Sequence, residues 1–157
     1  MINFDDLPPT NVEWLLCKPS EGFVNLPLEI IVIILEQLSF EDLIKLSQVN
    51  RELREIIKSV RWRHTVKLNK WTDEKLIYFV NNYNFINFDL RNSKITDTGL
   101  KVFNDHYCHT VNISGCSLVT DEGIKALSGC NTVILYGCNL VTNEVKKYLK
   151  DHGCITY

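Results

Sequence analysis

The sequence LPLEIIVIILEQL, residues 26–38, decides how the first part of the chain can fold. Pro27 suits the first position of a helix, because its missing N–H needs no partner there. From Leu28 to Leu35 only Glu29 is polar, so the predicted helix is apolar nearly all the way round. A unit of roughly forty residues buries too little surface to wrap such a helix on every side. We therefore expect the rest of the chain, or a partner, to cover it.

The apolar residues of this helix do not fix which side faces a core. The residues that could fill a local core are Ile30, Ile33, Ile34 and Leu38. Those on the other faces are Leu26, Ile31, Val32 and Leu35.

A second helix is predicted to begin near Phe40. Ser39 is a suitable N-cap, and Asp42, three residues later, completes an approximate capping box. Apolar residues then recur at helical spacing, and Trp62 follows them: Leu43, Leu46, Val49, Leu53, Ile56, Ile57 and Val60. This spacing predicts helical structure up to the approach to Trp62.

Several short motifs keep their order and spacing without a gap across this stretch. They are LPxEI (residues 26–30), Leu38-Ser39, Asp42-Leu43, Leu46-Ser47, Val49-Asn50-Arg51 and Trp62. Together they resemble an F-box, with two departures: Leu53 stands where many members have an aromatic residue, and Glu41 where Pro is common. The resemblance implies a small three-helix unit that docks on the Skp-type adaptor of cullin–RING ubiquitin ligases. It places these residues at that contact or directly supporting it: Leu26, Pro27, Ile30, Leu38, Leu43 and Val49. The alternative is an ordinary three-helix core without a partner, whose excess apolar surface would favour aggregation.

Downstream of Trp62 the sequence repeats. The related segments are residues 64–85, 86–108, 109–130 and 131–154, the first of which is degenerate. Each contains a short alternating strand, a turn, a Thr-Asp step or its equivalent, a helix, and a Cys or equivalent residue. Their lengths, about 22 to 24 residues, lie within the leucine-rich-repeat range, and they resemble the cysteine-containing leucine-rich repeats.

The two resemblances together predict an α/β protein. They imply a three-helix F-box followed by a short leucine-rich-repeat solenoid, with parallel strands on the concave face and helices on the convex face. We expect an N-terminal arm at residues 1–22, the F-box at 23–63 and the repeats at 64–157. The arm contains Trp14, which either packs on the body or binds a partner. The last repeat is expected to act as a cap, since Val145 and Lys146 replace the Gly and Ile of earlier copies.

The repeated positions have physical roles of their own. The strand residues expected to face the core are the pairs Val66/Leu68, Phe88/Leu90, Val111/Ile113 and Val133/Leu135. The expected helix N-caps are Thr72, Thr96, Thr120 and Thr142, and Asp73, Asp97 and Asp121 behind them favour a helix N-terminus.

The strand residues between the buried pairs point away from the core and align in two rows. These rows are Lys67, Asp89, Asn112 and Ile134, and Asn69, Arg91, Ser114 and Tyr136. In a solenoid they form the concave face, which typically binds ligands. The candidate target-binding residues are Asp89, Arg91, Asn112, Ser114, Ile134 and Tyr136. The alternative is that Ile134 and Tyr136 only cover the end of the stack, under Tyr157.

The cysteines follow the repeat rather than a metal-binding pattern. Cys116 and Cys138 share one repeat position, while Cys108, Cys130 and Cys154 share another. The sequence has no CxxC pair of the kind that usually marks a zinc site. We therefore expect all six cysteines, Cys17 included, to be reduced and free of metal. A metal site and a Cys-His nucleophile are the weaker alternatives, and neither a catalytic residue nor a cofactor is predicted.

Composition narrows the function classes further. The net charge is −2 and no basic stretch is long, which argues against nucleic acid as the main partner. No apolar run has membrane-spanning length, and a reducing cytosol or nucleus is the expected compartment. The two resemblances imply a non-enzymatic adaptor that brings an unidentified target protein to a cullin–RING ligase. The alternative is a scaffold or competitor that occupies the Skp-type adaptor without delivering a target.

Overall fold

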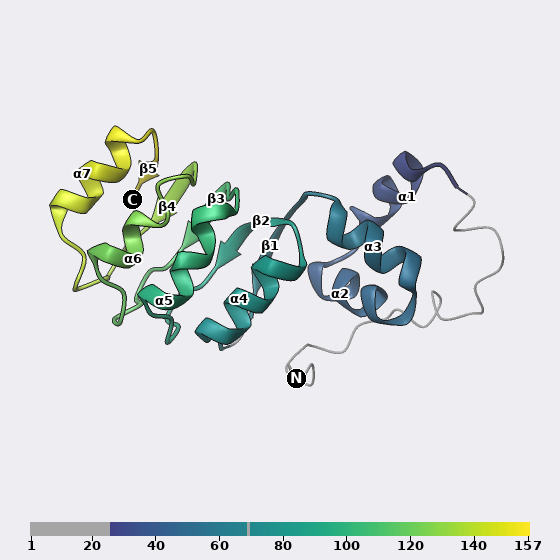
Figure 1. Ribbon diagram of the computed structural model, residues 1–157, viewed down its shortest axis with the longest axis horizontal. Coiled ribbons are helices and arrows are strands. Elements are labelled where there is room, and N and C mark those ends of the chain that lie inside the picture. Colours follow the sequence, from purple (N-terminus) through teal and green to yellow (C-terminus); the bar gives the residue numbers. More distant parts are fainter. Residues whose placement is uncertain (1–25, 69) are drawn as a thin grey trace.

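The computed structural model describes residues 26–68 and 70–157, and it joins a helical unit to a parallel sheet (Figure 1). The helical unit consists of α1 (Leu28–Leu35), α2 (Phe40–Val49) and α3 (Arg51–Ser59). The strands are β1 (Trp62–Lys67), β2 (Phe85–Asp89), β3 (Thr110–Asn112), β4 (Thr132–Ile134) and β5 (Ile155–Thr156). Between the strands lie α4 (Asp73–Asn82), α5 (Asp97–Leu100) with the 3₁₀-helix η3 (Lys101–Asp105), α6 (Asp121–Lys125) and α7 (Asn143–Asp151). The predicted N-terminal arm, with Trp14 and Cys17, lies outside the described residues.

Side chains at the helix starts define the helical unit. Ser39 caps α2: its Oγ accepts a hydrogen bond from the Asp42 backbone N–H at 3.1 Å, as predicted. The Asp42 carboxylate accepts from the Ser39 hydroxyl at 2.9 Å, which closes the capping box through side chains. Asn50 ends α2 and caps α3, where its Oδ1 accepts from the Leu53 N–H at 3.0 Å. This shared residue turns the chain sharply, so α2 and α3 pack against each other.

The sheet has five strands in the order β1-β2-β3-β4-β5, and every neighbouring pair is parallel. The helices α4 to α7 lie side by side along one side of it (Figure 1). The predicted register is confirmed, since Val66 aligns with Phe88, Phe88 with Val111 and Val111 with Val133. Strand connections of this kind require a crossover, which each helix supplies.

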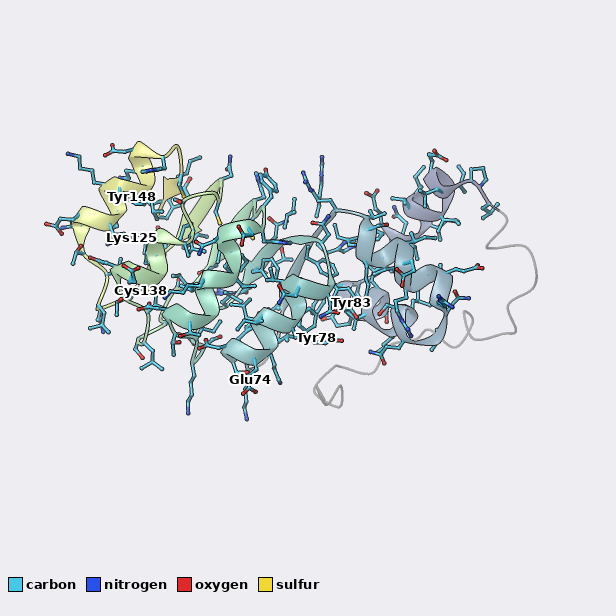
Figure 2. All side chains as sticks on the ribbon, viewed as in Figure 1. Glu74, Tyr78, Tyr83, Lys125, Cys138 and Tyr148 are labelled. Atoms are coloured by element: carbon cyan, nitrogen blue, oxygen red, sulfur yellow. The ribbon has the colours of Figure 1, made fainter. Side chains whose placement is uncertain are left out.

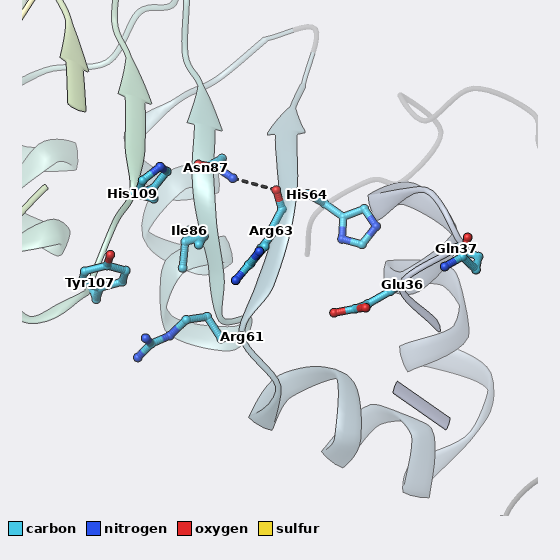
Figure 3. Close-up of a pocket in the computed structure, with 9 residues that line it drawn as sticks. All are labelled: Glu36, Gln37, Arg61, Arg63, His64, Ile86, Asn87, Tyr107 and His109. Carbon is cyan, nitrogen blue, oxygen red and sulfur yellow. Dashed lines mark hydrogen bonds between the residues drawn. The ribbon is translucent and has the colours of Figure 1, made fainter. Parts of the chain in front are cut away.

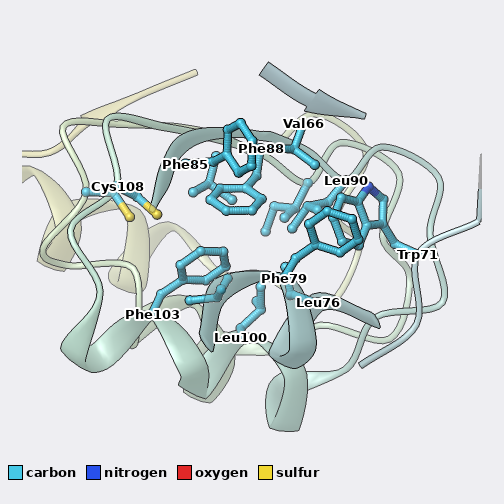
Figure 4. Close-up of a cluster of buried hydrophobic side chains, with 14 of the residues drawn as sticks. Val66, Trp71, Leu76, Phe79, Phe85, Phe88, Leu90, Leu100, Phe103 and Cys108 are labelled. Carbon is cyan, nitrogen blue, oxygen red and sulfur yellow. The ribbon is translucent and has the colours of Figure 1, made fainter. Parts of the chain in front are cut away.

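The core lies between the sheet and these helices (Figure 4). The strand residues predicted to face it are buried, except Leu68, which is half-buried. From the helix side, Leu76, Phe79, Leu100 and Phe103 are almost completely buried. Each such side chain contributes roughly 1.5–3 kcal/mol of hydrophobic stabilisation. The core is therefore continuous from one repeat to the next.

The aspartates behind the predicted N-caps link neighbouring repeats. The Asp73 carboxylate accepts hydrogen bonds from the Thr96 backbone N–H at 2.8 Å and the Thr96 hydroxyl at 2.6 Å. The same pair of bonds joins Asp97 to Thr120 and Asp121 to Thr142. We call this series the Asp–Thr ladder. Each aspartate fixes the start of the helix in the following repeat as well as favouring its own.

The helical unit and the sheet share a packed junction. The Ser47 hydroxyl lies 3.0 Å from the Tyr83 hydroxyl, and both residues are buried. Phe40 of α2 meets Phe85 of β2 edge to face, with ring centroids 6.4 Å apart. Figure 2 places Tyr83 where the sheet adjoins α2 and α3. Burial raises the pKa of Tyr83, so its hydroxyl stays protonated across the physiological range.

Candidate interaction surfaces

The first helix leaves five of its seven apolar side chains exposed or half-buried. Leu28, Ile30 and Ile33 are 52%, 43% and 56% exposed, whereas only Ile31 and Leu35 of α1 are buried. Of the four residues that could fill the local core, Ile30 and Ile33 are exposed, and Ile34 and Leu38 are half-buried. A helix that is apolar on every side has no polar stripe to mark the side that faces solvent. Packing within the helical unit therefore decides which side is buried. The exposed side still has to be covered by a partner or by other parts of the chain.

The residues predicted to form or support the adaptor contact fall into two groups. Leu26, Pro27 and Ile30 are exposed around the start of α1, and Val49 is 63% exposed at the end of α2. Leu38 is half-buried and Leu43 is completely buried. Leu43 can therefore only support such a contact by packing beneath it.

The first predicted row on the sheet aligns as expected, and in the second row backbone bonds from Asn92 to Ser114 and from Gly115 to Tyr136 keep the neighbouring segments adjacent. Lys67 pairs with Asp89, Asp89 with Asn112, and Asn112 with Ile134. Asn69, which begins the second row, lies outside the described residues. The sheet therefore presents a continuous line of side chains on the side away from the helices.

Polar side chains of the first row form hydrogen bonds with the second-row residue that lies two positions later in the chain. Arg91 donates from Nε to Asp89 Oδ1 at 2.8 Å and from a terminal nitrogen to Oδ2 at 2.7 Å. These bonds, more than the nearby Lys67, lower the pKa of Asp89. On the next strand, Asn112 Oδ1 accepts from the Ser114 N–H at 3.0 Å and its hydroxyl at 2.7 Å. The polar end of the face is thus ordered before any partner arrives.

The other end of the face is apolar. Ile134 is half-buried, and Tyr136 is 64% exposed. Tyr157 exchanges backbone hydrogen bonds with Val133 and Leu135 and is itself largely exposed. Tyr136 therefore remains accessible beside the ordered polar residues.

The described cysteines are buried and free. Cys116 Sγ donates to the Leu90 carbonyl and Cys138 Sγ to the Ile113 carbonyl, each at 3.2 Å. Burial, with the neighbouring Cys130 second, raises the pKa of Cys108, and burial raises that of Cys154 to about 11. Within residues 26–68 and 70–157, no group of three or more His, Cys, Asp or Glu residues has the geometry to hold a metal ion.

A groove that the sequence did not indicate lies where the helical unit meets the sheet (Figure 3). Its volume is about 1010 Å³, and its lining residues are Glu36, Gln37, Arg61, Arg63, His64, Ile86, Asn87, Tyr107 and His109. The Arg61 guanidinium carbon lies 4.8 Å from the centroid of the Tyr107 ring. We name this feature the junction groove. Its residues come from the segment after α1, from β1 and the residue before it, from β2, and from the loop before β3, so no local motif could predict it.

Comparison with known proteins identifies part of the chain. The family model of the F-box domain matches residues 23–68, which include α1, α2, α3 and β1. No curated protein matches the chain. Among the described residues, no helix has both the length and the apolar character needed to cross a membrane.

The match defines the class to which the first part of the chain belongs. Residues 23–68 are an F-box domain, as the motifs predicted. F-box domains bind Skp-type adaptors in cullin–RING ligases, so an adaptor role in an SCF-type ligase is implied. Proteins with this domain are typically non-catalytic. The match ends at residue 68, at the close of β1, so the role of the remaining strands depends on their geometry.

Proposed function

We propose that this protein is a substrate-recognition adaptor of an SCF-type ubiquitin ligase. In this proposal the F-box docks on a Skp-type adaptor, and the sheet binds a target protein for ubiquitination. The observation that carries the docking half is the exposed apolar surface of α1, where Leu28, Ile30 and Ile33 lie open to solvent. Leaving large aliphatic side chains in water forgoes roughly 1.5–3 kcal/mol apiece, which a partner can recover.

The docking residues in this proposal are those that the F-box motif designates. Leu26, Pro27, Ile30 and Val49 would contact the adaptor directly, because they are exposed. Leu38 and Leu43 would hold α1 and α2 in position from below.

The second half of the proposal treats residues 64–157 as a short leucine-rich-repeat solenoid. Parallel strands in sequential order, a helix after each of β1 to β4, and the Asp–Thr ladder support it. The target-binding residues would be Asp89, Arg91, Asn112, Ser114, Ile134 and Tyr136. The face carries an ordered charged pair at β2 and an exposed aromatic ring at the end of β4, and such a mixture is found at interface centres.

The docking half is tested by titrating a purified Skp-type adaptor into the full chain by calorimetry. The variant Ile30→Ala with Val49→Ala should bind at least about tenfold more weakly, equivalent to about 1.4 kcal/mol. The matched control is Leu118→Ala with Leu140→Ala, which removes two similarly exposed aliphatic side chains from the repeats. Equal affinity of both variants and the unmodified chain would refute docking through this surface.

One observation favours the alternative, a scaffold or competitor that delivers no target. Within the described part of the chain the sheet has five strands, the last with two residues, so the exposed face that they form is small. A reconstituted ligase distinguishes the two functions. An adaptor that delivers a target transfers ubiquitin to a captured protein, whereas a competitor only lowers transfer by other F-box proteins that share the same Skp-type subunit.

A further inference from the structure

The junction groove carries more positive than negative charge. Arg61 and Arg63 line it with His64 and His109, against a single carboxylate from Glu36. Figure 3 shows the two arginines between Tyr107 and His109 on one side and Glu36 on the other. Among the described residues, neither arginine forms an ion pair with a carboxylate. The chain as a whole has a net charge of −2, so this local excess is a property of the groove itself.

The Arg61 side chain is restrained before any ligand binds, and at Arg63 the backbone is fixed. Arg61 packs over the Tyr107 ring, a contact that restrains a guanidinium without neutralising its charge. The Arg63 carbonyl accepts a hydrogen bond from Asn87 Nδ2 at 2.7 Å, which fixes the backbone of β1 against β2. Restraining a charged side chain in advance lowers the entropy lost on binding. The planar guanidinium also offers paired donors that match a carboxylate.

The size and place of the groove indicate what occupies it. At about 1010 Å³ it is far larger than a single small anion requires. Asn87 lies two residues before Asp89 on β2, so the groove adjoins the face proposed to bind targets. An extended peptide crossing that face could enter the groove, and Ile86 and Tyr107 provide apolar contact for its backbone.

We infer that the junction groove binds an acidic peptide segment of a target protein, with Arg61 and Arg63 holding its carboxylates. The inference rests on the proposed target-binding role of the sheet and does not depend on adaptor docking. Nucleic acid is disfavoured, because the chain has a net charge of −2 and no long basic stretch.

The test is fluorescence polarisation with the full chain and a labelled short peptide of alternating Glu and Gly. We expect binding that weakens as salt rises, and no binding of the matched Gln and Gly peptide. Arg61→Glu with Arg63→Glu should weaken binding by at least about tenfold. The matched control, Lys101→Glu with Lys147→Glu, changes the net charge equally at exposed positions on the helices and should change affinity by less than about twofold. Tyr107→Ala, a milder change, should give an intermediate loss.

Three outcomes would overturn the inference. Equal binding of the Glu and Gln peptides would show that charge is not recognised. Equal losses in the groove variant and the control would show only a long-range effect of net charge. Stronger binding of a single-stranded oligonucleotide than of the Glu peptide would assign the groove to nucleic acid.

The same proteins separate this result from a failure of the proposed function. The groove variant should retain its affinity for the Skp-type adaptor and its thermal midpoint. Suppose that the variant Arg61→Glu with Arg63→Glu still captures the target, whereas Arg91→Glu with Tyr136→Ala does not. The groove inference would then be wrong, and the proposed target-binding role of the sheet would stand.

Discussion

Helices α1 and α4 are both short and rich in apolar residues, but they use those residues in opposite ways. Helix α4 buries Leu76, Phe79 and Val80 beneath the sheet. Helix α1 buries Ile31 and Leu35 and leaves its other large aliphatic side chains exposed or half-buried. The difference follows from their neighbours, since α4 has strands and α5 to pack against, whereas α1 has only a small helical unit. The contrast separates residues that hold the fold together from residues available to a partner.

The largest expected effect is the difference in the free energy of unfolding between two alanine variants, one in the core and one on the exposed side of α1. Phe88→Ala, in the core, should lower the free energy of unfolding by about 3–5 kcal/mol. Ile33→Ala, on the exposed side of α1, should change it by less than about 0.5 kcal/mol. Urea denaturation of both variants measures the difference. A large loss of stability at Ile33 would mean that α1 is a structural helix and would remove the contrast.

The next effect concerns how the repeats are joined. Asp97→Asn keeps the shape of the side chain but removes the charge that accepts two hydrogen bonds from Thr120. We expect a loss of about 1.5–3 kcal/mol in the free energy of unfolding, measured by the same denaturation. Asp105→Asn, an exposed aspartate outside the ladder, is the control and should be nearly neutral. Equal effects at both positions would show that the ladder bonds add nothing beyond surface charge.

A smaller effect is expected at the start of α1. Leu26→Ala with Pro27→Ala should weaken binding to the Skp-type adaptor about tenfold, or about 1.4 kcal/mol. Circular dichroism should show unchanged helix content, because both residues are exposed and precede the helix. Full affinity together with an intact fold would exclude this end of α1 from the interface.

The smallest effect is a dependence of stability on pH from Cys154. Burial raises its pKa to about 11, above the value in an unfolded chain. The folded state therefore keeps this proton where the unfolded state has lost it, so the contribution is full below about pH 8.5 and is lost as pH rises towards 11. The difference in unfolding free energy between the unmodified chain and Cys154→Ala should shrink across that range. A constant difference from pH 7 to pH 11 would show that the thiol is not shielded from solvent.

The sequence predicted those features that depend on local patterns. Period-two alternation identified Phe88 and Val111 as core residues, and the Thr-Asp steps located the helix starts, because both signals lie within a few residues. The F-box motif likewise needed only residues 26–62, and the family match confirms it.

The remaining features depend on contacts between distant segments. The Asp73–Thr96 bonds join residues 23 positions apart, so capping rules predicted the two ends separately but not their connection. Arg61 precedes β1 and Tyr107 precedes β3, and the two side chains meet because β1 and β3 flank β2 in the sheet. The buried side of α1 could not be chosen, because its sequence lacks a polar stripe that would orient it.

The Asp–Thr ladder also gives the stack a direction of growth. Every aspartate points forward, towards the repeat that follows it in the chain, and none points back. The fourth equivalent position holds Asn143, so the described series stops at Thr142. A repeat inserted before α7 would have an aspartate that accepts the ladder hydrogen bonds and a threonine that donates them. A repeat added after α7 would face the side-chain amide of Asn143 instead. Asn143→Asp would give α7 the carboxylate that holds the following threonine in the earlier repeats.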